Sequence, residues 1–158
     1  MNFAVNVSNL AKQYGYNVAV DSISFTVNQG EIFGFLGPNG AGKTTIIRVL
    51  TGQTKPTSGI AIVADYDVVQ EPTKAKECIG VVPEVSNVYD EMNAWDNLIF
   101  AAQLYVVPKN EWGKRARELL EVFGLYERGM DQVGTFSRGM KRRLTIAAAL
   151  IHKPVSSS

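Results

Sequence analysis

The chain has 158 residues, of which 46% are hydrophobic and 20% charged, and its formal net charge is +1 at pH 7. This length suffices for one domain with a sizeable core, and a near-neutral charge argues against a nucleic-acid partner bound through bulk charge. The absence of a long apolar run or a signal pattern, together with a lone Cys78 that excludes an internal disulfide, predicts a cytoplasmic chain that does not itself span a membrane.

Two segments near the N-terminus alternate apolar with polar or small residues, at 3–7 and at 23–27. Period-two alternation predicts half-buried antiparallel strands. A loop that carries aromatic residues, 12–16, is expected between them, and a tight turn at 28–30 is expected to follow. Tyr14 in this loop could stack on a nucleotide base or cover the edge of the sheet, and the residues alone leave both interpretations open.

The next segment predicts a phosphate-binding loop between a strand and a helix. The apolar run 32–36 predicts a buried parallel strand, and 44–51 predicts a helix that stops near Gly52. Between them the template G-x-x-x-x-G-K-S/T is filled by Gly37, Pro38, Asn39, Gly40, Ala41, Gly42, Lys43 and Thr44, and Thr45 follows. In this motif, backbone N–H groups surround phosphate oxygens, the Lys43 ammonium stabilises phosphate charge, and the Thr44 hydroxyl binds Mg²⁺.

Alternating strand and helix patterns continue to Glu84. A strand is expected at 60–63, a short helix at 71–78, and a buried strand at 79–82. Because open α/β sheets place ligand groups at the ends of their strands, Glu84 is a candidate for contact with Mg²⁺ or with an attacking water. The alternative interpretation is a solvated loop carboxylate.

From Asn93 onward the pattern is helical only. Helices are expected at 94–105, 109–123 and 141–152, and their apolar stripes indicate core packing. Ser137 is a natural N-cap, and with Gly139 it leaves N–H groups exposed to an anion. Arg138 and the cations 141–143 lie near the N-terminus of this helix, where the helix dipole disfavours positive charge. Their position favours a functional role for these cations over a merely solvated helix face.

The motifs together resemble the nucleotide-binding subunit of an ABC transporter. The resemblance rests on the phosphate loop 37–45 and on the segment 136–144, and it covers nearly the whole chain. It implies an α/β P-loop NTPase fold, with a RecA-like core, an antiparallel β subdomain and an α-helical signature subdomain. The implied division is 1–84 for the β subdomain and P-loop core, 85–152 for the helical subdomain, and 153–158 for a disordered tail.

Several roles follow from this resemblance, residue by residue. Tyr14 matches the aromatic residue that stacks on adenine, and Glu84 matches the Q-loop glutamine, which contacts Mg²⁺. The region from Glu84 to Leu98 matches the surface that meets the membrane permease. The signature stretch contacts the ATP held by a second nucleotide-binding subunit in trans, and its residues here are Phe136, Ser137, Arg138, Gly139 and Met140.

Three departures from the common family pattern stand out. Arg138 and Met140 replace Gly and Gln, and Glu84 replaces Gln; these variants resemble a drug, sodium or ABC-2-type exporter branch. The third departure is that the family's Walker B strand, catalytic Glu and switch His would follow Pro154, whereas the chain reads only four residues further. The resemblance therefore implies an N-terminal portion of the domain, an incomplete sheet, and no general base in the chain.

The sequence thus predicts an ATP- and Mg²⁺-binding subunit that couples ATP binding and hydrolysis to transport through a permease, in the direction of export. Its expected location is the cytoplasmic face of the membrane, its expected partners are a second nucleotide-binding subunit and the permease, and no nucleic acid is expected. The alternatives are a nucleotide-binding or regulatory fragment that does not hydrolyse ATP, and a soluble ABC protein without a transport role.

Overall fold

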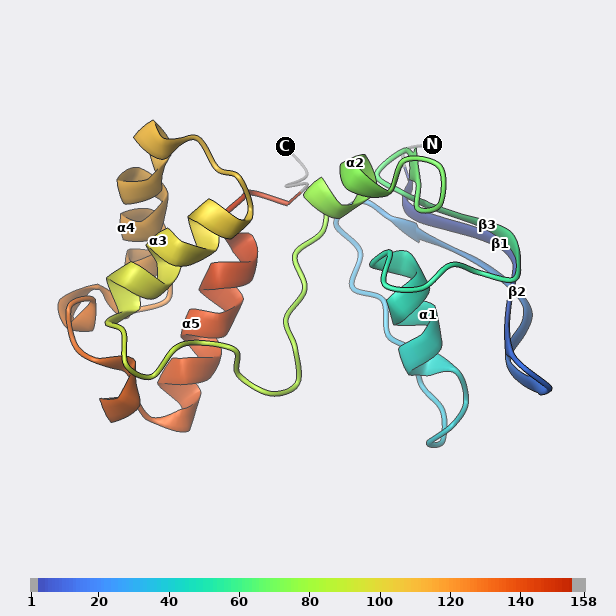
Figure 1. Ribbon diagram of the computed structural model, residues 1–158, viewed down its shortest axis with the longest axis horizontal. Helices are drawn as coiled ribbons and strands as arrows, with labels where there is room; N and C mark the ends of the chain where they lie inside the picture. Colours follow the sequence, from blue (N-terminus) through green and yellow to red (C-terminus); the bar gives the residue numbers. More distant parts are fainter. Residues whose placement is uncertain (1–2, 155–158) are drawn as a thin grey trace. The chain divides into compact units, whose positions relative to one another are not determined.

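The computed structural model describes residues 3–154, which form two compact units, residues 3–79 and 80–154 (Figure 1). Each unit is described by itself. The domain boundary expected after Glu84 stays a prediction, and residues 155–158 of the expected tail lie outside the described residues.

The first unit is an antiparallel sheet with two helices. The strands follow the order β2-β1-β3-β4, and every neighbouring pair is antiparallel. The elements of this unit are β1 (Phe3–Tyr14), β2 (Asn17–Asn28), α1 (Lys43–Leu50), β3 (Ser58–Val63), β4 (Tyr66–Asp67) and α2 (Pro72–Glu77).

The hairpin β1–β2 is longer than the sequence pattern indicates. Pairing continues to Tyr14 and Asn17, so the expected loop 12–16 is wrong except for its tip, Gly15 and Tyr16. Gly15 has a φ of 58°, a left-handed conformation that suits the tight connection. Tyr14 therefore sits at the end of a strand, where backbone pairing holds it.

The core of this unit consists of alternate apolar side chains along β1 and β3, together with a short apolar stripe on α1. Val7, Leu10 and Ala61 are buried from the sheet, and Val49 of α1 is fully buried against the same cluster. Each of the buried valine and leucine side chains stabilises the fold by about 1.5–3 kcal/mol. The packing fixes α1, and with it the loop that precedes α1, relative to the sheet.

Two predicted strands are absent from the described residues. The segment 32–36 forms no strand, and Ile32 and Leu36 are 100% and 97% exposed. A parallel strand needs ladder partners, and the sheet of the described residues offers none to this segment. Its aromatic rings instead pack with Phe25, whose centroid lies 5.3 Å from those of Phe33 and Phe35. The segment 79–82 likewise has no regular structure, so this strand prediction is also wrong.

The second unit is helical, as expected. Its core joins the three α-helices, with Leu98, Leu120 and Leu144 fully buried. Short 3-10 helices connect or extend them at Lys109–Glu111 (η1), Tyr126–Arg128 (η2) and Val133–Thr135 (η3). The α-helices are α3 (Ala94–Leu104), α4 (Trp112–Val122) and α5 (Arg138–Leu150).

Capping residues determine where these helices begin and end. Asn93 caps α3 by accepting from Asp96 N, and Gly124, with a φ of 64°, follows the end of α4. The predicted helix 141–152 begins earlier, at Arg138, because the Ser137 hydroxyl accepts from Met140 N and starts the helix there. Among residues 3–154, no helix is long and apolar enough to cross a membrane.

Candidate functional site

The phosphate loop lies directly before α1, as the motif predicts. Gly42 is the residue before the helix and has a φ of 83°, and no side chain caps the first turn. The leading N–H groups of α1 are therefore not satisfied by a side-chain cap, and they lie at the positive end of the helix dipole. This arrangement favours an anion at the loop.

Gly42 also makes the closest backbone approach in the loop. A β-carbon at this position would lie 2.4 Å from the Ala19 carbonyl oxygen. Ala19 is the extra residue of a bulge in β2, since Lys12 pairs with Val20 and Gln13 with Val18. The bulge thus brings β2 against the phosphate loop, and only glycine fits the contact.

The Lys43 ammonium folds back over the loop. Its Nζ donates hydrogen bonds to the carbonyl oxygens of Gly37, at 2.5 Å, and Pro38, at 2.6 Å. Both acceptors are neutral, whereas a phosphate oxygen is charged and forms the stronger, charge-assisted hydrogen bond. A phosphate oxygen would therefore replace these carbonyls as the acceptor of the ammonium when a nucleotide binds.

A cleft of about 320 Å³ joins the phosphate loop to the base of the β1–β2 hairpin. It lies entirely in the first unit and brings Tyr14 to the loop, with the phenol side chain 45% exposed. Tyr16 is fully exposed and does not line it. The lining residues are Tyr14, Asn17, Val18, Ala19, Asn39, Gly40, Gly42, Lys43, Thr44 and Thr45. Tyr14 thus shares one cleft with six of the predicted phosphate-loop residues, whereas Gly37, Pro38 and Ala41 do not line it.

The magnesium candidates are Thr44 and Glu84. Thr44 lines the cleft, and its hydroxyl is a hard oxygen ligand of the kind that Mg²⁺ takes together with nucleotide phosphates and water. Glu84 is exposed and belongs to the second unit, so its role stays a prediction. Among residues 3–154, no group of three or more His, Cys, Asp or Glu side chains could hold a metal.

The signature stretch forms the start of α5. Phe136 is buried in the helical core with the Arg128 guanidinium 5.0 Å from its ring centroid, and Met140 Sδ accepts from the same arginine. Ser137 and Gly139 are exposed. A β-carbon on Gly139 would meet only Ser137 Oγ, at 3.9 Å, so nothing in the described chain requires glycine here.

The cations at the start of α5 have partners within the second unit. Lys141 forms an ion pair with Asp90 at 2.7 Å, and Arg143 donates to the Phe123 carbonyl at the end of α4. Arg142 donates to the Pro83 carbonyl. Asp90 is an acidic partner for Lys141, so this lysine needs no external anion at the start of the helix, and the functional interpretation of Arg138 stays a prediction.

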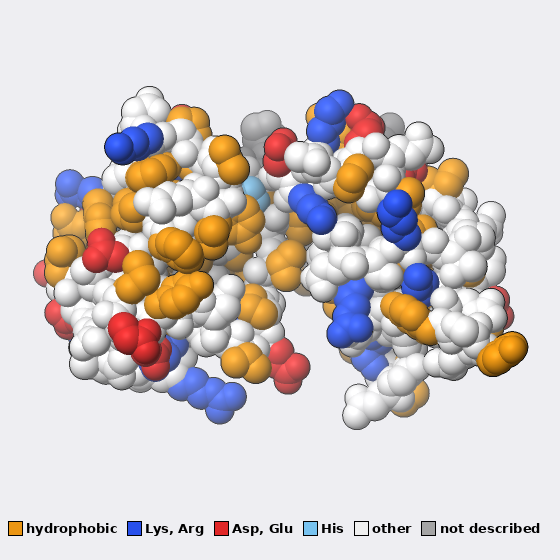
Figure 2. Space-filling model, in the orientation of Figure 1, with side chains coloured by type: hydrophobic (Ala, Val, Ile, Leu, Met, Phe, Trp, Pro, Cys, Tyr) orange, Lys and Arg blue, Asp and Glu red, His pale blue; other side chains and the backbone are white. Residues whose placement is uncertain are grey.

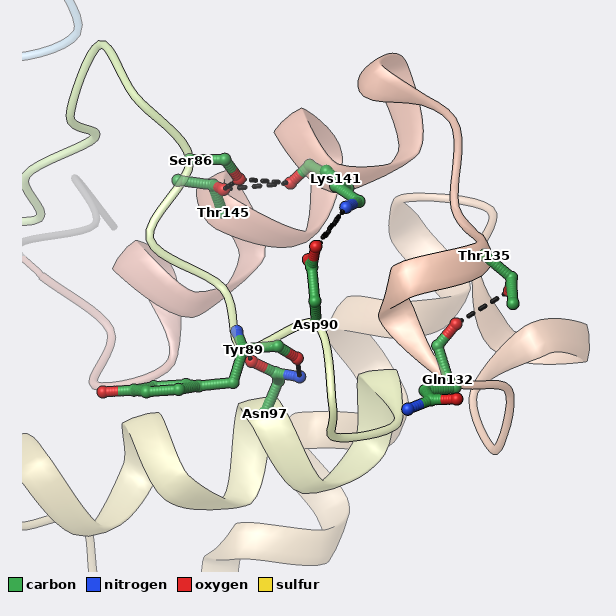
Figure 3. A network of polar contacts seen from close by, with 8 residues as sticks. All are labelled: Ser86, Tyr89, Asp90, Asn97, Gln132, Thr135, Lys141 and Thr145. Atoms are coloured by element: carbon green, nitrogen blue, oxygen red, sulfur yellow. Dashed lines mark hydrogen bonds and ion pairs between the residues drawn. The ribbon is translucent and has the colours of Figure 1, made fainter.

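Polar side chains hold the segment 86–90 against α3 and α5 (Figure 3). Asn97 is only 4% exposed; it accepts from Tyr89 N at 2.8 Å and donates to Tyr89 O at 3.0 Å. The Ser86 and Thr145 hydroxyls lie 2.6 Å apart. Neither Thr145 nor the structural role of Asn97 was predicted from the sequence, although a polar residue on an apolar helix face is a signal for such a role.

Charges are mixed on the surface. In the view of Figure 2, acidic and basic side chains both occur on each unit, interspersed with neutral and hydrophobic ones. This mixture agrees with the net charge of +1.

The fold and the cleft define a P-loop nucleotide-binding domain with a helical signature subdomain. Residues 20–155 match the family model described as ABC transporter, and the chain belongs to that family. It is 45% identical over 150 residues to the linearmycin resistance ATP-binding protein LnrL of Bacillus subtilis, covering 95% of this chain and 48% of that protein. It is 44% identical over 155 residues to the doxorubicin resistance ATP-binding protein DrrA of Mycobacterium tuberculosis, covering 97% and 47%.

Solved structures agree on the fold. An ATP-binding subunit of an ABC transporter superposes with a TM-score of 0.80 at 28% identity, covering 96% of this chain and 63% of that one. CbiO1 from Clostridium perfringens, part of the ABC transporter complex cbiONQ, superposes with a TM-score of 0.87 at 25% identity. This match covers 98% of this chain and 63% of the CbiO1 chain. The chain spans about half the length of the curated relatives that it matches.

Proposed function

We propose that the chain is the ATP-binding part of an exporter-type ABC subunit, which couples Mg-ATP binding and hydrolysis to transport through a membrane permease. The observation that carries the proposal is the cleft of about 320 Å³ that Tyr14 and the phosphate loop share, since its volume is in the range of ligand pockets. The relatives named for linearmycin and doxorubicin resistance support the direction of export.

Each part of the cleft suits one part of the nucleotide. The uncapped start of α1 and the Lys43 ammonium would stabilise phosphate charge, and the Thr44 hydroxyl, which lines the cleft, would bind Mg²⁺. Tyr14 offers a ring face for the base. Bound Mg²⁺ would neutralise charge on the phosphates during hydrolysis.

Two exposed surfaces of the second unit are proposed to meet partners. Gly139 costs its helix about 1 kcal/mol relative to alanine, and no contact in the described chain requires it. A close approach by a second nucleotide-binding subunit, with its ATP, would explain the glycine. The exposed region around Glu84 is proposed to face the permease, which would place the subunit on the cytoplasmic face of the membrane.

A hydrolysis-deficient nucleotide-binding protein is the second candidate. One observation favours it: none of the ten residues that line the cleft is a carboxylate, so the cleft itself provides no carboxylate base for an attacking water. Nucleotide binding without turnover would support this alternative. A non-transport ABC protein acting on nucleic acid is disfavoured by the net charge of only +1.

Calorimetry with Mg-ATP tests the proposal. We expect saturable binding by the wild-type chain and at least about tenfold weaker binding by Lys43→Ala, because the charged donor to the phosphates is lost. Lys76→Ala is the matched control, since Lys76 is also exposed in the first unit but does not line the cleft. Equal affinities of wild type and Lys43→Ala would refute the proposal, and phosphate release measured on the same samples separates the two candidates.

A further inference from the structure

The Lys12 side chain lies over the ring of Tyr14 in the proposed nucleotide cleft. Its Nζ is 4.8 Å from the ring centroid, within the range of a cation–π interaction. The two residues are two apart on β1, so both side chains emerge on the same face of the strand. Lys12 itself does not line the cleft, and no motif in the sequence singles it out.

The ammonium of Lys12 is also anchored from another part of the chain. Its Nζ donates a hydrogen bond of 2.7 Å to the Lys55 carbonyl oxygen, in the turn between α1 and β3. The neighbouring backbone is held by Gln13 N, which donates to Thr57 Oγ1 at 3.0 Å. These contacts fix the Lys12 side chain, so the tyrosine ring has a fixed neighbour on one face.

We propose that Lys12 is a positioning residue that prepares the Tyr14 ring to stack on the base, and so sets the preference of the cleft for nucleotides over bare polyphosphate. This inference rests on the proposed function. An ordered ring loses less freedom when the base binds, and a cation on one face draws π-electron density from the ring. The other face is left for an aromatic base.

Replacing Lys12 should weaken the contact of the cleft with the base and leave its contacts with the phosphates unchanged. We define the base preference as the dissociation constant of Mg-tripolyphosphate divided by that of Mg-ATP, both measured by calorimetry. Both ligands fill the phosphate loop, but only ATP reaches Tyr14. A change in overall positive charge near the loop would shift both constants together and leave the base preference unchanged.

Four variants test the inference. Tyr14→Ala should abolish the base preference, and Lys12→Met should lower it about two- to fivefold while tripolyphosphate binds as in wild type. Lys12→Arg keeps the cation and should keep the preference. Lys55→Met is the matched control: it removes an exposed positive charge near Lys12, and the contact of Lys55 to Lys12 uses only its backbone carbonyl.

A Lys12→Met variant with the wild-type base preference, or one that weakens both ligands equally, would overturn the inference. So would a Lys12→Arg variant that loses the preference as fully as Lys12→Met while retaining the wild-type circular dichroism spectrum. Failure of the proposed function looks different, because the wild-type chain would then bind neither ligand or bind both independently of Lys43.

Discussion

Replacing Gly42 with alanine tests whether β2 and the phosphate loop form one rigid site. The added β-carbon would lie 2.4 Å from the Ala19 carbonyl oxygen and 3.1 Å from a methyl carbon of Val20. The carbonyl belongs to the backbone of β2, so it cannot rotate away as the end of a flexible side chain could. We expect overpacking of this kind to cost about 1–3 kcal/mol in the free energy of unfolding.

Gly40 provides the matched control. Its φ of 86° is nearly that of Gly42, at 83°, but a β-carbon there would meet nothing within 4 Å. Both Gly→Ala variants share the left-handed backbone cost of about 1–2 kcal/mol, offset in part by about 0.4–1 kcal/mol of lost freedom in the unfolded chain. The difference between the two variants therefore isolates the close approach.

Urea unfolding of the nucleotide-free chain, followed by circular dichroism, measures this difference. We expect Gly42→Ala to be about 1–3 kcal/mol less stable than Gly40→Ala, with an unchanged dependence on urea concentration. Equal stability of the two variants would refute the claim that the bulge in β2 presses against the loop.

Two further predictions concern single buried groups. Asn97→Ala removes hydrogen bonds to Tyr89 N, Tyr89 O and Asn93 O and should cost about 2–3 kcal/mol in urea unfolding. The exposed Asn110→Ala should change stability by less than about 0.5 kcal/mol, and similar values for the two variants would contradict a stabilising role for the Asn97 hydrogen bonds. Burial raises the pKa of the Cys78 thiol, so the pH midpoint of its alkylation by iodoacetamide should lie higher in the folded chain than in urea. The corresponding stabilisation is present below the unfolded pKa and is lost as pH rises through the folded pKa, and coincident midpoints would contradict this.

Local signals in the sequence predicted most of the helices. Apolar stripes predicted α3, α4 and α5, and the capping residue Ser137 was identified, although α5 begins three residues before the predicted start. The phosphate loop was located because its residues encode a local conformation with left-handed glycines. Such features depend on neighbours in the sequence, which a single sequence provides.

Features that depend on distant partners were predicted less well. The apolar run 32–36 carries the composition of a buried strand, but a strand forms only where another strand offers ladder hydrogen bonds. Similarly, the basic run 141–143 could not be interpreted without knowing that Asp90 and the Phe123 carbonyl lie beside it. The contact of Lys12 with Tyr14 was missed because no propensity rule links them.

Nucleotide binding in the cleft is tested most directly by mapping Mg-ATP onto the folded chain through the amide chemical shifts of a nitrogen-15-labelled sample. If the cleft binds the nucleotide, the largest changes fall on its residues, in 37–45 and 14–19, and they are smaller in Lys43→Ala at the same Mg-ATP concentration. Changes confined to the second unit, or changes at the cleft that persist undiminished without Lys43, would contradict nucleotide binding in the cleft.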